Sequence, residues 1–312
     1  MRAWLAGALI AASVAASVAA TAAGPVPVTI PSRDRDPATG APLQLGALLF
    51  LPPATPGVRV PAVVALHGCG GMYGTARGSR NDLSIRHRRM AELLVADGYA
   101  VLFPDSFRAR GREQVCTVAA RERTITPTTR RLDALDALAY LQGRDDVLPD
   151  RIAVLGWSHG GSTTLATMDA RAPVVAAARA AGGPPYFHAA IAYYPACRAA
   201  RGTRGGYVPA APLLLLVGSG DDWTAPEPCV DLVTRLRDAG VPATLALYAD
   251  AAHGFDGPDG DRRHLDVPGG VHPGQGVTVA SHPAARDDSY ARVRAFLRAE
   301  LRAAAGARNQ EE

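Results

Sequence analysis

Lysine is absent from this chain of 312 residues, and all 33 of its basic residues are arginines, set against 29 acidic residues. The formal charge of +4 is small and the arginines are interspersed with acids, so we expect no nucleic-acid partner. Internal repeats, coiled-coil heptads and zinc-ligand spacings are also missing. Asp256, Asp259 and Asp261 superficially suggest a calcium loop, but the glutamate that an EF-hand requires is lacking. We therefore expect neither a metal nor another cofactor.

Long apolar runs are confined to the N-terminus. After a basic start at Arg2, residues 4–20 carry no charge and small residues follow, which is the pattern of a signal peptide. We expect residues 1–23 to be removed by cleavage between Ala20 and Gly24, and the protein to be exported to the periplasm or the medium. The alternative is an uncleaved membrane anchor, although alanine is only weakly hydrophobic. Residues 24–312 then form a single domain with no stable membrane insertion.

The most informative motif is Gly-Trp-Ser-His-Gly at residues 156–160. It follows a predicted buried strand at 152–155 and precedes a run of small residues with helical character. In that context G-x-S-x-G is a nucleophile elbow, which holds its serine above the sheet edge at a helix N-terminus. We therefore predict that Ser158 is a nucleophile. The alternative is that Ser158 only caps the helix that begins at His159.

A nucleophilic serine requires a base that is itself oriented by a carboxylate. Where this elbow occurs, the acid and then the histidine follow in loops after later strands. Asp221 follows the apolar strand predicted at 211–217, and His253 follows the strand predicted at 243–248. We predict these two residues as acid and base, and expect most of the other seven histidines to be exposed. Asp222 is the alternative acid, or it caps the following helix.

A glycine-rich segment, His67-Gly68-Cys69-Gly70-Gly71, follows another predicted strand at 60–66. Glycines there let the main chain approach a substrate carbonyl and direct an N–H group at it. We predict that the backbone N–H groups of Cys69 and His159 form an oxyanion hole. The alternative is an ordinary glycine-rich turn.

Five segments together, H-G-C-G-G, P-D-S-F, G-W-S-H-G-G, G-S-G-D-D-W-T and A-H-G-F-D, resemble the dienelactone hydrolase family of α/β-hydrolases. The resemblance runs from about Leu43 to Leu301. It implies an α/β fold with an eight-stranded, mostly parallel sheet, helices on both faces, and hydrolysis of ester or lactone carbonyls. Family members that act on dienelactone itself carry cysteine where this chain has Ser158. The resemblance therefore favours a serine carboxylic-ester hydrolase over that particular substrate.

The chain between the motifs is consistent with this architecture. Helical periodicity predicts helices at 88–96, 130–141 and 287–304, which alternate with strands and indicate a parallel sheet. The long connections 107–129 and 254–286 are candidate lids or binding loops. Five aromatic residues flank the motifs and are expected either to line a pocket or to belong to the core: Phe107, Trp157, Tyr194, Trp223 and Phe255.

Four cysteines in an exported chain allow three disulfide pairings. In the sheet order that the resemblance implies, the strands before Cys69 and Cys116 are neighbours, as are those before Cys197 and Cys229. The resemblance therefore implies the disulfides Cys69–Cys116 and Cys197–Cys229. Each is expected to stabilise a loop beside the site by about 2–4 kcal/mol.

The residues predict two-step acyl transfer on a small-molecule ester or lactone. His253, oriented by Asp221, takes the proton of Ser158, and water then hydrolyses the acyl-enzyme. Because His253 must be neutral, we expect activity to rise with pH through about 6 to 7. One alternative is a peptidase of the prolyl-oligopeptidase kind. We rank it lower because the chain lacks room for a separate gating domain before the first strand. Another is a catalytically silent binding protein on the same scaffold.

Overall fold

The computed structural model describes residues 24–302 apart from 37, 75–80, 181–184 and 259. The predicted signal peptide, residues 1–23, lies outside the described residues. None of the helices described is long and apolar enough to cross a membrane.

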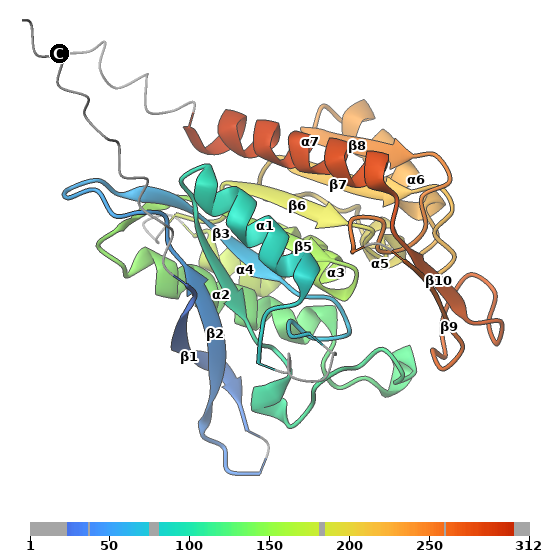
Figure 1. Ribbon diagram of the computed structural model, residues 1–312, viewed down its shortest axis with the longest axis horizontal. Helices are drawn as coiled ribbons and strands as arrows, with labels where there is room; N and C mark the ends of the chain where they lie inside the picture. The colour runs from blue at the N-terminus through green and yellow to red at the C-terminus, as the bar shows by residue number, and fades with distance from the viewer. Residues whose placement is uncertain (1–23, 37, 75–80, 181–184, 259, 303–312) are drawn as a thin grey trace, which may run out of the picture.

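An eight-stranded sheet is the framework of the molecule (Figure 1), in the order β1-β2-β4-β3-β5-β6-β7-β8. Strand β2 pairs antiparallel with β1 and β4, and all other neighbours are parallel. The strands of this sheet are β1 (Val26–Arg35), β2 (Pro42–Phe50), β3 (Val60–Leu66), β4 (Ala100–Pro104), β5 (Val147–Trp157), β6 (Ala189–Tyr193), β7 (Leu213–Gly218) and β8 (Ala243–Tyr248). The predicted α/β-hydrolase architecture is confirmed.

Helices cover both faces of the sheet, and Figure 1 shows α1 and α7 together on one of them. On the other face, α2, α3 and α6 contribute to a second apolar cluster. The helices are α1 (Ile85–Ala96), α2 (Pro127–Gln142), α3 (His159–Met168), α4 (Pro173–Ala178), α5 (Arg198–Arg201), α6 (Glu227–Asp238) and α7 (Pro283–Arg302), with 3₁₀ turns at Arg108–Arg110 and Ala120–Glu122.

The central strands are apolar throughout because both of their faces are buried. In β3, Val63 and Ala65 pack into the cluster under α1 and α7, whereas Ala62, Val64 and Leu66 pack into the opposite cluster. Side chains alternate along a strand, so a strand covered on both sides has no polar positions. This explains why continuous apolar runs predicted the strands correctly.

The long connection after β8 differs from its expected irregular form. It contains a two-stranded antiparallel sheet of β9 (Asp261–His264) and β10 (Val277–Ala280), which projects from one side of the molecule in Figure 1. Strand β9 has the sequence Asp-Arg-Arg-His, without the alternating apolar residues that identify a strand. The predicted terminal helix also begins earlier than expected, at Pro283.

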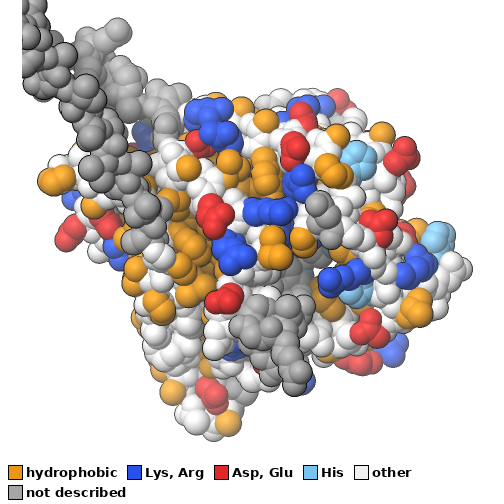
Figure 2. Space-filling view, in the orientation of Figure 1, with side chains coloured by type: hydrophobic (Ala, Val, Ile, Leu, Met, Phe, Trp, Pro, Cys, Tyr) orange, Lys and Arg blue, Asp and Glu red, His pale blue; other side chains and the backbone are white. Residues whose placement is uncertain are grey.

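Charged side chains of both signs are interspersed over the face drawn in Figure 2, in keeping with the scattered arginines of the sequence. The expectation that most of the other seven histidines are exposed is wrong: His67, His87 and His159 are buried, and of the seven only His272 is exposed.

Candidate active site

Ser158 lies at the sharp turn between β5 and α3. Its φ of 52° and ψ of −114° are strained for a residue with a side chain. Glycine is required on both sides, since a Cβ at Gly156 would overlap the carbonyl of Gly160, and one at Gly160 would overlap the carbonyl of Leu66. The motif residues therefore permit a turn that lifts the serine above the carboxyl ends of the parallel strands.

The structure brings Ser158, His253 and Asp221 together from three different loops. The Oγ of Ser158 lies 2.9 Å from Nε2 of His253, and Nδ1 of His253 lies 2.8 Å from Oδ2 of Asp221. A carboxylate can only accept, so Nδ1 carries the proton and Nε2 is free to accept the serine hydroxyl. His253 and Asp221 are each 3% exposed, which shields this chain of hydrogen bonds from water.

The carboxylate of Asp221 is held by its own loop. Oδ1 accepts the backbone N–H groups of Trp223 (2.9 Å) and Thr224 (2.8 Å), and Oδ2 accepts the Thr224 hydroxyl at 2.8 Å. Burial disfavours the carboxylate, but the nearby His253 and these hydrogen bonds outweigh it and lower the pKa of Asp221. The side chain therefore stays ionised and fixed in direction.

Asp222 points to a different partner. Its carboxylate accepts the backbone N–H of Thr278 at 2.7 Å and the Thr278 hydroxyl at 3.0 Å, and pairs with Arg263 at 3.1 Å. Thr278 and Arg263 belong to β10 and β9, so Asp222 fastens the projecting hairpin to the site. The helix that follows, α6, has Pro226 at its N-cap and no side-chain cap, so the expected capping role of Asp222 is wrong.

The two predicted oxyanion residues lie beside the nucleophile. Cys69 and His159 line the same cavity as Ser158, which has a volume of about 440 Å³. The Cys69 loop packs closely on the elbow, since a Cβ at Gly68 would lie 3.6 Å from Cβ of Ser158. The carbonyl of Cys69 accepts the N–H of Val115 at 2.8 Å.

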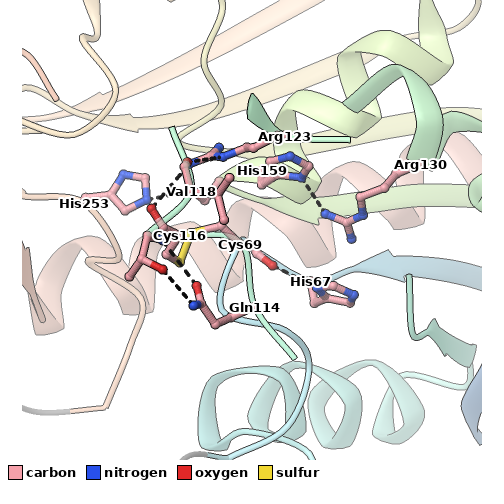
Figure 3. The surroundings of a disulfide bond; sticks show 12 residues. His67, Cys69, Gln114, Cys116, Val118, Arg123, Arg130, His159 and His253 are labelled. Atoms are coloured by element: carbon pink, nitrogen blue, oxygen red, sulfur yellow. Dashed lines mark hydrogen bonds between the residues drawn. A yellow bond between two sulfur atoms is a disulfide. The ribbon is translucent and has the colours of Figure 1, made fainter. Parts of the chain in front are cut away.

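Both predicted disulfide pairings are present in the structure: Cys69 is bonded to Cys116, and Cys197 to Cys229. Figure 3 shows the first of them beside the site, with His159 pointing to Arg130 on the side away from His253. The disulfide ties the loop after β3 to the long connection after β4. That connection supplies Arg123, whose guanidinium donates to the carbonyl oxygens of Val118 and Cys116.

A buried arginine next to the elbow, Arg130, was not predicted from the sequence to belong to the site. Arg130 donates to Nδ1 of His159 at 2.9 Å, and burial lowers the pKa of Arg130 to about 10. Burial, followed by the charge of Arg130, holds the pKa of His159 well below its usual value, so the imidazole is neutral. Arg130 begins an amphipathic helix in the sequence, where arginine is typical of an exposed face, so nothing local distinguishes it.

A second cluster that the sequence did not reveal surrounds Asp256. Its fully buried carboxylate accepts Trp157 Nε1 at 2.7 Å and the Tyr194 hydroxyl at 2.6 Å, and it pairs with Arg86 at 3.1 Å. Arg86 also donates to the carbonyl of Gly254. The cluster therefore joins the residue before the nucleophile to the loop that carries the histidine.

Aromatic rings enclose the imidazole of His253. The ring centroids of Tyr194 and Trp223 lie 4.6 and 4.8 Å from that of His253. Trp223 is partly exposed and lines the cavity, whereas the other four aromatic residues singled out in the sequence are buried in the core: Phe107, Trp157, Tyr194 and Phe255.

No group of three or more His, Cys, Asp or Glu side chains within the described ranges is arranged to hold a metal ion.

The dienelactone hydrolase family model matches residues 45–301. Solved structures with a similar fold include a dienelactone hydrolase-like promiscuous phosphotriesterase from metagenomic libraries, at 19% identity and a TM-score of 0.59, with 89% of this chain and 99% of that chain covered. Esterase 2 of Thermogutta terrifontis is 16% identical with a TM-score of 0.56, and the coverage is 89% and 95%. A search of curated protein sequences gave no significant match.

Larger enzymes share the fold as well. The acylaminoacyl peptidase of Pyrococcus horikoshii is 16% identical with a TM-score of 0.57 over 89% of this chain. Only 42% of the peptidase chain is covered, so this protein corresponds to less than half of it.

Proposed function

The chain belongs to the dienelactone hydrolase family, and from that premise we propose that it is a serine hydrolase that cleaves carboxylic esters or lactones. The observation that carries the proposal is the pair of short distances, 2.9 Å from Ser158 Oγ to His253 Nε2 and 2.8 Å from His253 Nδ1 to Asp221 Oδ2. The strained backbone of Ser158 supports it further, because such strain is concentrated at functional sites.

The proposed reaction has two steps. Oγ of Ser158 attacks the carbonyl carbon as its proton passes to Nε2 of His253, and Asp221 stabilises the imidazolium that forms. The imidazolium then protonates the leaving alcohol, which gives an acyl-enzyme. Water attacks the acyl-enzyme by the same route and regenerates the serine hydroxyl.

We propose that the backbone N–H groups of Cys69 and His159 stabilise the tetrahedral oxyanion. His159 is the first residue of α3, whose N-terminus carries partial positive charge. The ring of His159 points to Arg130, on the side away from His253. Losing one oxyanion donor typically costs about 10²–10³ in rate.

Labelling with a fluorophosphonate tests the proposal directly. We expect the protein to react at Ser158 and the Ser158→Ala variant not to react, because only an activated serine attacks phosphorus. Ser162→Ala is the matched control, since Ser162 lines the same cavity one turn further along α3. Absence of labelling in the native protein would favour a catalytically silent scaffold.

Substrate assays separate the remaining enzyme alternatives. We expect hydrolysis of p-nitrophenyl esters and of a lactone, and none of a peptide anilide. Cleavage of the anilide alone would favour a peptidase, as in the acylaminoacyl peptidase that shares this fold.

We also propose that the protein is exported. The two disulfides support this, because disulfides persist in oxidising compartments and are rare in the cytosol. N-terminal sequencing of the mature protein tests the predicted cleavage between Ala20 and Gly24.

A further inference from the structure

The cavity beside Ser158 extends well beyond the reacting atoms. Its floor is one face of α3, formed by Ser162, Leu165, Ala166 and the helix C-cap Asp169. A helix rises about 1.5 Å per residue, so Leu165 and Asp169 lie roughly 10 and 16 Å from Ser158 along the axis. The cavity is therefore a channel that leads away from the nucleophile.

The middle of this channel is mostly apolar. One wall comes from the long connection after β4 and the start of α2, including Ala120 and Pro127, and the other from Ala199, Ala200 and Tyr207. The hydroxyl of Tyr207 donates to the carbonyl of Leu165 at 2.9 Å, so it is already satisfied. Small side chains on facing walls leave room for an unbranched chain.

The far end of the channel holds an unused hydrogen-bond donor. Arg131 lines the channel from the first turns of α2, and its guanidinium has no hydrogen-bond or ion-pair partner among the described residues. Burial lowers the pKa of Arg131, while the charge of Asp169 acts against that shift. Buried donors normally have partners, so a ligand that supplies an acceptor here would satisfy the Arg131 group.

The position of the channel relative to His253 identifies which half of the substrate it holds. His253 protonates the leaving alcohol in the proposed reaction, so the alcohol must face His253. His253 itself does not line the cavity; its neighbours Trp223 and Thr224 do, beside Ser158, and from there the channel follows α3. The channel therefore lies on the acyl side of the scissile bond.

We propose that this channel selects esters with a long, unbranched acyl chain whose far end carries a hydrogen-bond acceptor for Arg131. An extended chain covers about 3.5 Å for every three bonds, so the span from Ser158 to the region of Leu165 and Asp169 corresponds to about nine to fourteen atoms. The inference rests on the proposed ester hydrolysis and names the acyl class that the same site takes.

Chain length is tested with p-nitrophenyl esters from acetate to decanoate. We expect kcat/KM to rise by at least tenfold over the series, since each methylene buried is worth up to about fourfold. The variant Ala166→Phe, which fills the channel floor, should lose at least tenfold on decanoate and less than threefold on acetate. Ala176→Phe on the exposed face of α4 is the matched control and should behave as the native protein.

Equal kcat/KM for acetate and decanoate in the native protein would overturn the inference. So would an equal loss on both esters in Ala166→Phe, because that result indicates a general disturbance of the site.

The acceptor is tested with ten-carbon acyl esters whose far end is a methyl group, a methyl ester or a carboxylate. We expect the two acceptor-bearing substrates to have a KM at least fivefold lower than the methyl-terminated one. Arg131→Met should abolish that difference, whereas Arg235→Met on α6 should preserve it. A preference for carboxylate identifies an anionic acyl group, and one for methyl ester a neutral acceptor. If the methyl-terminated substrate has the lowest KM in both proteins, Arg131 does not recognise the acyl end.

A binding measurement separates this inference from the proposed function. The monomethyl ester of a ten-carbon diacid is titrated calorimetrically into Ser158→Ala and into Ser158→Ala/Ala166→Phe. Binding to the first and not to the second supports the channel even if no ester is hydrolysed. No binding to either, together with normal hydrolysis of acetate, overturns the channel and leaves the hydrolase proposal standing.

Discussion

Asp221 and Asp222 are adjacent in the chain, yet their carboxylates have unrelated surroundings. Asp221 turns inward to His253 and is held by three donors from its own loop. Asp222 turns outward to Thr278 and Arg263 of the hairpin. One residue therefore orients the imidazole, and the next attaches the hairpin beside it.

This difference predicts that the same substitution lowers kcat strongly at Asp221 and only slightly at Asp222. Asp221→Asn should lower kcat by about 10³–10⁴, because an amide cannot stabilise the imidazolium and favours the wrong tautomer. Asp222→Asn keeps the size and one acceptor oxygen and loses only contacts to the hairpin, so it should leave kcat within about threefold. Steady-state kinetics on a short ester measure both, and circular dichroism checks that each variant is folded. A larger loss in Asp222→Asn than in Asp221→Asn would contradict the assignment.

The residues brought together at the site were predictable where a local pattern marks them. Ser158 lies in a five-residue motif, and Asp221 and His253 each follow an apolar strand. Arg130 and Asp256 were not predictable, because their partners come from segments that no pattern connects. Asp256 meets Trp157 and Arg86, which are 99 and 170 positions away along the chain.

Among the secondary-structure elements, three depend on the single carboxylate of Asp256. It binds Trp157 at the end of β5, Tyr194 just beyond β6 and Arg86 on α1, and it follows the histidine loop itself. Because a buried carboxylate without donors is costly, these contacts fix the relative positions of the elbow and the histidine.

Asp256→Asn should therefore impair catalysis without preventing binding. We expect kcat to fall by about tenfold or more with KM nearly unchanged, since the reacting atoms lose alignment. Asp288→Asn, at a carboxylate on the surface of α7, is the control and should leave kcat and KM unchanged. A fall in kcat no larger than that of the control would argue against this positioning role.

The two disulfides allow a matched comparison of loops. Replacing Cys69 and Cys116 by alanine should lower both stability and kcat, because the loop that carries the proposed oxyanion donor is released. Replacing Cys197 and Cys229 should lower stability by a similar amount, about 2–4 kcal/mol, and largely spare kcat. Urea unfolding and ester hydrolysis measure the two effects, and equal kcat in both variants would contradict the expectation.

The elements that sequence patterns predicted are those buried on one or both faces. Strands β3, β5, β7 and β8 were identified from the apolar runs at 60–66, 152–155, 211–217 and 243–248, and α2 from its helical periodicity. The β9–β10 hairpin was missed because β9 is exposed and polar and β10 has only four residues, although Val277 is buried. Contacts of Asp222 with Thr278 and Arg263 hold the hairpin, and such long-range contacts leave no hydrophobic period in the sequence.

For the molecule as a whole, three buried histidines set the response to acid. Burial lowers the pKa of His67 and His159 well below the usual value and that of His87 to about 3. The unfolded chain takes up protons at these positions below about pH 6.5, whereas the folded protein does not. Protons thus favour the unfolded state, and stability should fall as the pH drops from about 6.5 towards 3.

The expected slope is about 1.4 kcal/mol per pH unit for each such histidine. Urea unfolding at pH 7.5, 6, 5 and 4.5 with both disulfides intact measures this slope. The variant His87→Gln should reduce it by the contribution of one histidine. The pKa of Asp221 is also lowered, but its contribution is lost only below about pH 4, so it falls outside this window. A stability that is constant from pH 7.5 to 4.5 would contradict the prediction.

The placement of the tryptophans gives the protein a built-in optical probe. The chain has three, and removal of residues 1–23 leaves only Trp157 and Trp223. Trp157 is sealed in the core with its N–H bound to Asp256, whereas Trp223 borders the cavity and contacts the ring of His253. Iodide in solution can contact the indole of Trp223 and quench its fluorescence, but it cannot reach the indole of Trp157. A molecule that occupies the cavity will shield that indole, so quenching reports occupancy without any label or turnover.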